Sequence, residues 1–557
     1  MRILIIFILF LSLYQTNLYA NIDNEKKFNP KYLSKYFSGL VSFDNQEFEK
    51  SYRFFNSSKT LISKHNQFLK AYIFTLIANN KFSYAINKVK LSRNKEYSNF
   101  FEGELLLILD SIKRKKFKQA SKFLENLSNY KDQGTYQFII FETLKSYNDL
   151  FISKKFKKNT DFGRISEIND AFQNCYLGTP LTQIYFEKLI NTSEDYSRYK
   201  YFYLQYLINN NELNLAIETS SNINHLESNL LLLQAKTWID KKNFNKFNEN
   251  FLCNNEDNLL SEFFFLISNL YSTDENYVLS EFYLKISNYL NPNFYFNTIL
   301  EVDNLYVNEQ YIKAQNTLDK LPDNAEVYSW YKIRKKTQIL SKIESKKKSQ
   351  SYIEAELKKI DKPSLKILYD AANIYKSLKN YNKAIEFYTA VLLNLKKDSE
   401  ARSDVLYRRG GSYERMNDYK KSDQDFFEAL KINPEAPHVL NYLAYSWLER
   451  DYKINEAMIM LKKAYQLRKE DPYIIDSIGW AYYLIGDFIN AEKLIIQAVM
   501  LMPDDPIVND HYADILWKLD RKIQARYFWQ YVLKLDETSD EMKEEVSRKI
   551  LNGLSNI

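Results

Sequence analysis

The length, composition and charge of this chain together exclude several broad classes of protein. A chain of 557 residues is longer than one ordinary hydrophobic core can organise, unless the protein is an elongated repeat array. With 10 glycines and 10 prolines against 45 tyrosines and 37 phenylalanines, the composition argues against a disordered chain and a turn-rich sheet protein, and for packed helices. The net charge of +7 is mild, and basic runs such as 113–118 are interpreted as solvated turns.

The first twenty residues have the pattern of a secretory signal. Arg2 precedes an apolar run of 11 residues at 3–13, a polar break follows, and Ala20 provides a small residue for cleavage. An uncleaved anchor is the alternative, although a bilayer span needs about 20 apolar residues. No later segment is long and apolar enough to span. We therefore expect 1–20 to be a signal peptide and the mature chain to be periplasmic, envelope-associated or free, without a nucleic-acid partner.

A hairpin-like periodicity follows the signal and weakens in the middle of the chain. Over 32–130, aromatic and small residues recur as pairs at spacings of 34 and 35 residues and predict three divergent hairpins: Phe48 with Ser51, Phe82 with Ala85, and Phe117 with Ala120. The segment 131–196 contains helical stretches without this register. Over 197–364 the pairs return at spacings of 31 to 34 residues and predict further divergent hairpins.

The pattern is strongest over 365–538, where five units follow one another in phase. Their starts, at 365, 403, 437, 472 and 506, are separated by 34 to 38 residues. In each unit a small residue of the first helix is expected to approach the second helix closely. A final helix within 539–557, with a charged outer face, is expected to cap the array. The predicted structural positions are Ala372, Ala384, Gly410, Ala429, Pro434, Ala444, Ala457, Gly479, Ala491, Ala498, Pro503, Ala513 and Ala525.

The unit at 472–505 identifies a family. Gly479, Ala491 and Pro503 stand at the small-residue and proline positions of a repeat of about 34 residues, and the unit resembles a tetratricopeptide repeat (TPR). The resemblance implies an all-α, right-handed α-solenoid of TPR helical hairpins with a C-terminal capping helix. Residues 472–529 are also similar to the carboxyl-terminal end of long exported TPR proteins of Gram-negative bacteria, chiefly alphaproteobacteria, which implies a scaffold role.

The resemblance also implies where a partner binds. In TPR proteins the first helix of each repeat lines a concave groove with its second, fifth, ninth, twelfth and thirteenth residues. Aromatic, charged and amide side chains there suit an extended peptide or a helical segment. Trp480 and Trp517 have an alternative role, filling gaps between hairpins. The groove residues carried over are Tyr369, Asn373, Tyr407, Arg408, Asn441, Tyr445, Asp476, Trp480, Tyr483, Asp510, Asp514 and Trp517.

The charge of the groove end gives an expectation about the ligand. TPR domains that clamp a terminal carboxylate carry Lys, Arg and Asn where this chain has Asp476, Asp510 and Asp514. Because acidic side chains repel a carboxylate, the sequence predicts a neutral or basic ligand segment.

Cysteines and histidines give no sign of a metal or catalytic site. Cys175 and Cys253 are 78 residues apart, more than two repeats, and are expected to be isolated buried thiols, because a disulfide requires Cα atoms within about 7 Å. The four histidines are scattered, and no known catalytic or phosphate-binding motif is present. We therefore expect no enzymatic activity, no cofactor and no bound metal.

The predicted function is a non-catalytic scaffold for protein–protein interactions in the bacterial cell envelope. Two alternatives remain. One is a component of an envelope export or assembly machine, such as one for polysaccharide secretion, which a basic or aromatic stripe in the first half would support. The other is an enzyme or glycan-binding module in 131–196, which would require a deep pocket with converging polar groups. The partner, the oligomeric state and the pathway are not specified by the sequence.

Overall fold

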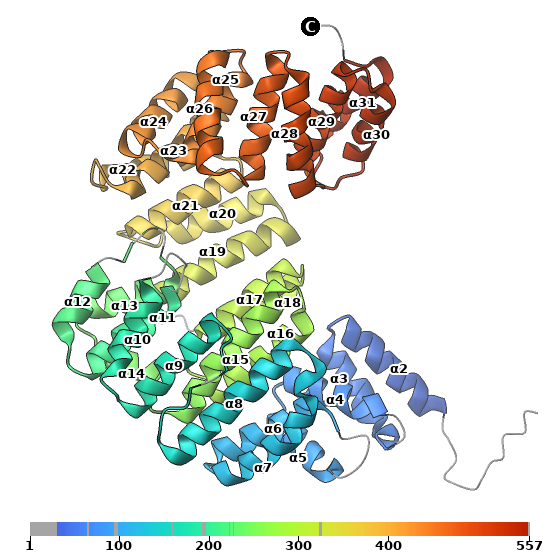
Figure 1. The fold of residues 1–557 in the computed structure, drawn as a ribbon, viewed down its shortest axis with the longest axis vertical. Helices are drawn as coiled ribbons and strands as arrows, with labels where there is room; N and C mark the ends of the chain where they lie inside the picture. Colours follow the sequence, from blue (N-terminus) through green and yellow to red (C-terminus); the bar gives the residue numbers. More distant parts are fainter. Residues whose placement is uncertain are drawn as a thin grey trace, which may run out of the picture. The chain divides into compact units, whose positions relative to one another are not determined.

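The computed structural model describes residues 30–63, 66–93, 99–158, 160–191, 197–221, 223, 224, 226, 228–321 and 326–554. Within these ranges every regular element is a helix, which confirms the all-α class (Figure 1). The predicted signal at 1–20 lies outside the described residues. No helix in the described ranges has both the length and the apolar composition that a membrane crossing requires.

The chain forms two compact units. The first comprises the described residues up to Ile223 together with Ser228–Tyr328, and the second comprises the short piece with Asn224 and Leu226 together with the described residues from Ser329 onward. The first unit contains α2 (Pro30–Asp44), α3 (Phe48–Ser57), η1 (Lys59–Leu61), α4 (Asn66–Ala78), α5 (Phe82–Ser92), α6 (Phe101–Lys113), α7 (Phe117–Leu127), η3 (Ser128–Gln133), α8 (Thr135–Ser153), α9 (Arg164–Leu177), α10 (Leu181–Ile190), α11 (Ser197–Asn209), α12 (Leu213–Ser221), α13 (Leu230–Asp240), α14 (Asn245–Asn250), α15 (Glu256–Thr273), α16 (Tyr277–Leu290), α17 (Phe296–Val307) and α18 (Tyr311–Leu318).

Helix α19 (Glu326–Ile343) begins in the first unit and continues into the second. The second unit then contains α20 (Lys346–Leu357), α21 (Leu365–Ser377), α22 (Tyr381–Leu393), α23 (Glu400–Glu414), α24 (Tyr419–Ile432), α25 (Pro437–Leu448), α26 (Ile454–Leu467), α27 (Pro472–Leu484), α28 (Phe488–Leu501), α29 (Pro506–Lys518), α30 (Lys522–Val532) and α31 (Asp540–Asn552).

The sequence specifies the turns of the second unit locally. Between α27 and α28, Gly486 has a φ of 83°, a conformation that a residue without a Cβ adopts readily. Asp487 then caps α28, because its side chain accepts a hydrogen bond of 3.2 Å from the backbone N–H of Asn490. Asp418 caps α24 in the same way. These residues reverse the chain so that each second helix packs against its first.

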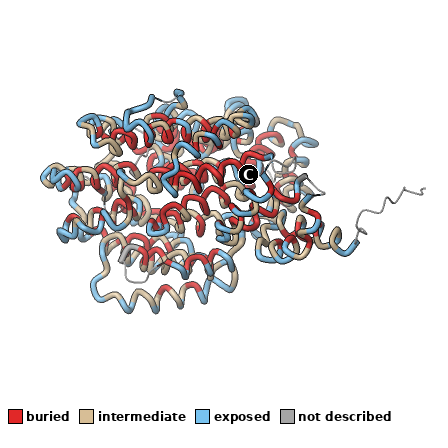
Figure 2. Tube along the Cα trace, turned by 90° about the horizontal axis from the view of Figure 1, so that it is seen from below, coloured by how far each residue is buried: buried red, intermediate tan, exposed pale blue. Residues whose placement is uncertain are grey.

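Small residues lie where the helices of a hairpin touch. A Cβ on Gly479 of α27 would come within 2.7 Å of the Ile495 side chain on α28, and one on Gly410 of α23 within 3.0 Å of Phe426 on α24. Figure 2 shows the wider pattern, in which helices have a buried and an exposed side. Pro434 and Pro503 are exposed and follow the ends of α24 and α28. The alanines at the predicted structural positions are fully buried: Ala372, Ala384, Ala429, Ala444, Ala457, Ala491, Ala498, Ala513 and Ala525.

The helices of the first unit do not form a simple linear stack. Late in this unit, α15 and α16 pack against α4, α6 and α8 near its beginning. Phe74 of α4 stacks on Phe282 of α16 with ring centroids 4.3 Å apart, and Phe82 of α5 stacks on Tyr289 of α16 at 4.1 Å. These ring partners are 208 and 207 residues apart in the sequence. The late hairpins therefore cover part of the early ones.

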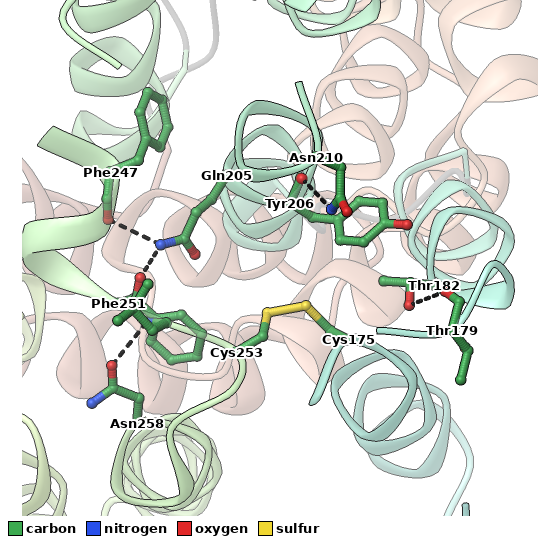
Figure 3. The surroundings of a disulfide bond; sticks show 11 residues. Cys175, Thr179, Thr182, Gln205, Tyr206, Asn210, Phe247, Phe251, Cys253 and Asn258 are labelled. Atoms are coloured by element: carbon green, nitrogen blue, oxygen red, sulfur yellow. Dashed lines mark hydrogen bonds between the residues drawn. A yellow bond between two sulfur atoms is a disulfide. The ribbon is translucent and has the colours of Figure 1, made fainter. Parts of the chain in front are cut away.

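A disulfide bond joins two distant segments of the first unit. Cys175, near the end of α9, is bonded to Cys253, in the loop before α15, and their Cα atoms are 5.6 Å apart (Figure 3). Beside the bond, Gln205 of α11 donates a hydrogen bond of 2.9 Å to the Phe247 carbonyl and a second one to that of Phe251. The prediction of isolated thiols was wrong. It assumed that residues 78 positions apart lie more than two repeats apart along a linear array, whereas this unit folds back on itself.

Candidate binding surface on the inner helices

Five first helices of successive hairpins carry the residues predicted to bind a partner. They are α21, α23, α25, α27 and α29, and each packs against the second helix that follows it. Tyr369, Asp476, Asp510 and Asp514 are buried. The other predicted residues are half-buried: Asn373, Tyr407, Arg408, Asn441, Tyr445, Trp480, Tyr483 and Trp517.

The first predicted positions are already engaged within the chain. The Tyr369 hydroxyl donates a hydrogen bond of 2.6 Å to Asp404, and Arg408 Nε donates one of 2.8 Å to the same carboxylate oxygen. The Tyr388 hydroxyl donates to the Asn373 side-chain oxygen at 2.6 Å. Tyr369 and Asp404 therefore hold Arg408 in place rather than contacting a ligand themselves.

A lysine that the sequence prediction left out lies among these helices. A Cβ on Gly411 of α23 would be 3.5 Å from Lys376 Nζ of α21 and 3.5 Å from the Tyr442 hydroxyl of α25, so side chains from three inner helices converge at Gly411. Burial, together with the nearby Arg408 and Arg415, lowers the pKa of Lys376 to about 8. Among the described residues no carboxylate forms an ion pair with Lys376.

Lys376 could have been found from the sequence. It is the twelfth residue counted from Leu365, and the twelfth position is one of those that face the groove in TPR proteins. The two arginines close to it do have carboxylate partners, since Arg408 pairs with Asp404 at 2.8 Å and Arg415 with Glu414 at 3.5 Å. Of these three cations, Lys376 is therefore the one without an ion pair of its own among the described residues, although the charges of Asp404 and Glu414 also act on it.

Aromatic and amide groups adjoin this basic region on α23 and α25. Tyr407 lies edge-on to His438, with ring centroids 4.8 Å apart, and edge-on to Tyr442 at 5.7 Å. The side-chain oxygen of Asn441 is buried and has no hydrogen-bond partner within the described part of the chain. Tyr445, one helical turn further on α25, is half-buried, and burial raises the pKa of its phenol. That oxygen has almost no exposed surface, so a ligand N–H reaches it only where the half-buried Asn441 side chain turns outward.

Three rings form a stack further along the inner helices. Trp480 of α27 lies between Tyr483, at a centroid distance of 4.5 Å, and His511 of α29, at 4.0 Å. His511 Nδ1 is 2.9 Å from Asp476 Oδ1. Burial by itself would lower the pKa of His511, but Asp476 at this distance, with Asp510 nearby, raises it above the ordinary value. The stack fixes Trp480 against the next hairpin, which agrees with the gap-filling alternative.

The two remaining aspartates are paired with the last helix. Lys549 of α31 donates hydrogen bonds to Asp510 at 2.7 Å and to Asp514 at 2.9 Å, and Trp529 Nε1 donates to Asp514 at 3.0 Å. The expectation that these acidic side chains face a ligand is therefore corrected, since all three are buried, Asp476 is bonded to His511, and the other two carboxylates share Lys549. The inference of a neutral or basic ligand loses its premise.

Trp517 is also covered from within the chain. Its indole lies against Gly553, where an added Cβ would clash with the ring, and Arg526 lies over the ring at 5.0 Å from its centroid. Trp517 therefore packs against the end of the chain. The accessible part of the inner-helix surface runs from Lys376 to Tyr483.

The segment 131–196 uses its polar side chains to hold its own loop. Gln173 of α9 both donates to and accepts from the backbone of Lys157, at 2.9 and 3.0 Å. Ser166 donates to the Thr160 carbonyl at 2.9 Å. These groups position the loop between α8 and α9.

Comparisons with known proteins identify the repeats. Residues 365–393 and 403–435 match the sequence profile of the tetratricopeptide repeat, and these ranges begin at two of the predicted unit starts. A TPR repeat-containing protein of Pseudomonas aeruginosa is 30% identical over 131 residues, which cover 24% of this chain. The match spans only 22% of the length of that relative.

Among solved structures, similar chains are also repeat proteins. A tetratricopeptide repeat protein from Parabacteroides merdae covers 46% of this chain and is itself covered to 99%, with 17% identity and a TM-score of 0.38. A thermophilic TPR protein of Thermus thermophilus covers 34% of this chain and is covered to 100%, with 16% identity and a TM-score of 0.30.

Proposed function

Because this chain is a tetratricopeptide-repeat protein, we propose that it is a non-catalytic scaffold that holds an extended segment of a partner protein on the inner helices α21 to α27. TPR proteins generally act as protein-interaction scaffolds and are typically not enzymes. Their repeats expose an extended preformed surface, and the side chains on it determine which partner binds.

The observation that carries the proposal is a pair of polar groups on the inner helices without partners of their own in the described part of the chain, the half-buried Lys376 and the enclosed side-chain oxygen of Asn441. Lys376 has no carboxylate partner among the described residues, and the buried side-chain oxygen of Asn441 accepts no hydrogen bond there. A peptide that places a carboxylate beside Lys376 and a backbone N–H beside Asn441 would satisfy both. The proposed ligand is therefore a peptide segment with an acidic residue, flanked by apolar contacts with Tyr407 and Tyr445.

We further propose that the protein works in the cell envelope after export. The pattern at 1–20 motivates this location. The bond between Cys175 and Cys253 supports it, since structural disulfides persist in oxidising compartments and are rare in the cytosol. The location is tested by fractionating cells that express the full chain with a carboxyl-terminal tag. Recovery of the tag in the cytosol, with both cysteines reduced, would contradict it.

Peptide selection tests the binding surface. Random peptides displayed on phage are selected on the full chain, and the affinities of enriched peptides are measured by fluorescence anisotropy. We expect acidic sequences to be enriched and the double variant Lys376→Gln, Asn441→Ala to weaken their binding about tenfold to a hundredfold, the effect of losing one charged and one neutral hydrogen bond.

A matched control distinguishes the surface from a general effect of charge. Lys431 and Asn455 are exposed on second helices of the same unit, and Lys431→Gln with Asn455→Ala makes the same chemical change. Enriched peptides should bind this control as tightly as the wild type. Equal affinity for both double variants would remove the inner helices from the proposal.

A role in an envelope export or assembly machine is the second candidate. One observation favours it: the first unit has a basic and aromatic cleft lined by Tyr52, Lys59, Lys81 and Tyr84, in the half of the chain where such a feature was expected for this role. A scaffold with a docking surface on each of two units brings two components together. Co-purification of two different envelope proteins, each lost with variants of one unit only, would distinguish this role from a single-partner adaptor.

A further inference from the structure

The first unit has a cleft of its own, lined by residues of that unit alone. It has a volume of about 540 Å³ and lies between the end of α3, the short helix η1 and the start of α5, with Tyr289 of α16 at its side. Binding pockets typically have volumes of about 300–1,000 Å³. Because α3 and α5 are the second helices of their hairpins, this cleft is not a continuation of a first-helix surface.

The lining of this cleft is basic. Lys59 and Lys81 line it, and its lining residues include no aspartate or glutamate. Lys59 Nζ donates a hydrogen bond of 2.9 Å to the Tyr84 hydroxyl, and Lys81 Nζ lies 5.0 Å from the centre of the Tyr52 ring. Neither lysine forms an ion pair with a carboxylate in the part of the chain that the structure describes. Tyrosine rings hold both ammonium groups without neutralising them.

The titration of Tyr84 agrees with a positive local potential. Burial by itself would raise the pKa of its phenol, but the hydrogen bond from Lys59, with a further one from Tyr72 and the charge of Lys88, lowers it below the ordinary value. Lys88 Nζ lies 5.3 Å from the Tyr84 ring centre and adds a third positive charge beside the cleft.

We propose that this cleft binds an acidic segment of a polypeptide, with aspartate or glutamate carboxylates paired to Lys59 and Lys81. The exposed side chains of Asn56, Asn80 and Ser83 at the same cleft offer hydrogen-bond donors and acceptors to the peptide backbone. The rings favour a peptide over an acidic sugar. A sugar binds by stacking on a free aromatic face, whereas Tyr52 and Tyr84 each carry a lysine ammonium of this chain.

The test uses the full chain and a short fluorescent peptide of alternating Glu and Ser. The measurement is made in the Lys376→Gln, Asn441→Ala background, so that the second unit does not contribute and failure of the proposed function does not affect the result. Adding Lys59→Gln and Lys81→Gln should weaken binding about three- to thirtyfold, as expected for losing two partly exposed charge pairs. The matched control adds Lys118→Gln and Lys122→Gln, two exposed lysines of α7, and should leave the affinity unchanged.

Three outcomes would overturn the proposal. One is equal affinity of the peptide for the Lys59, Lys81 variant and the Lys118, Lys122 control. Another is undiminished binding of a peptide with Gln in place of Glu. The third is binding of an oligogalacturonate at concentrations where the peptide does not bind, which would assign the cleft to an acidic glycan. Circular dichroism verifies folding in each case, and both cleft lysines retain solvent contact, so their replacement should preserve the fold.

Discussion

In the second unit, each helix from α21 to α30 packs against the next helix in the sequence, whereas in the first unit α15 and α16 return to α4, α6 and α8 near its beginning. Asn308 and Gln310 both donate hydrogen bonds to the Gln46 side chain, at 2.9 and 2.8 Å, across more than 260 residues of sequence. Similar hairpins therefore build an array of neighbours in one unit and a closed arrangement in the other.

The two units also achieve close helix packing with different residues. In the second unit, glycine and alanine bring the helices of a hairpin together. In the first, α15 and α16 approach through serines: Ser268 and Ser280 each donate to the other's backbone carbonyl, at 2.7 and 2.8 Å, and Ser261 and Ser287 do the same at 2.9 and 2.6 Å. Serine is small enough for close contact, and its hydroxyl is satisfied by the facing backbone. The repeat signature is therefore weak there although hairpins still form.

Removal of the disulfide should have the largest effect, and it should be confined to the first unit. Replacing Cys175 and Cys253 with serine should destabilise the first unit by about 2–5 kcal/mol, because the bond closes a long loop in the unfolded chain. Hydrogen exchange read by mass spectrometry should show faster exchange in α9, α11 and α15. Peptides from α21 to α30 should exchange as in the wild type.

Treatment of the wild type with a reductant provides the matching control, because it opens the same bond without changing the sequence. Both samples should lose protection in the same helices. Unchanged hydrogen exchange in α9 and α15 would mean that the other long-range contacts are enough to hold the first unit together. The disulfide would then add nothing to its stability.

A smaller effect is expected from overfilling a contact in the neighbour-to-neighbour array. Ala491 of α28 is fully buried in the core shared with α29, and Ala491→Leu should destabilise the second unit by about 1–3 kcal/mol. Ile489→Leu, at a position 70% exposed on the same helix, is the control and should change little. Urea unfolding followed by hydrogen exchange would measure both. No loss of stability for Ala491→Leu would count against the assigned register.

The difference between the units explains how much of the fold the sequence predicted. Over 365–538 the determinants are local, since turn residues such as Gly486 and small residues such as Gly479 act within one hairpin, and their spacing is visible in a single chain. The closure of the first unit depends on pairs such as Phe74 with Phe282, and no local sequence pattern indicates that these two residues are in contact. The same limitation produced the wrong conclusion about the cysteines.

For the candidate site, the sequence predicted the helices more reliably than the exposed groups. Tyr407 and Asn441 are half-buried residues on the first helices of their hairpins. Asp510 and Asp514 were misjudged because their partner, Lys549, lies 35 and more residues further along the chain on α31. Which charges of a repeat surface remain available depends on such tertiary pairs.

The smallest predicted effect is a pH dependence confined to the second unit. Because Asp476 holds the pKa of His511 above its unfolded value, protonated His511 stabilises the folded unit fully below the ordinary histidine pKa of about 6.5, and this contribution is lost as the pH rises through the folded pKa. As the pH rises from the unfolded pKa to the folded pKa of His511, the unfolding free energy of the wild type should fall relative to that of His511→Gln. The fall is at most about 1.4 kcal/mol per pH unit for one proton.

His438 provides a control of opposite sign on the same surface. Burial lowers its pKa, so its contribution to stability is smallest at low pH and grows as the pH rises towards the unfolded value of about 6.5. Urea midpoints measured from pH 5 to 8 should therefore show that His511→Gln and His438→Gln change the pH slope in opposite directions. The slopes of the first unit, read from hydrogen exchange in α15 and α16, should be unaffected by either change. If the pH slopes of both units changed together, the ion pair between His511 and Asp476 would not be the source of the pH dependence. The effect of the titration would then not be confined to the second unit.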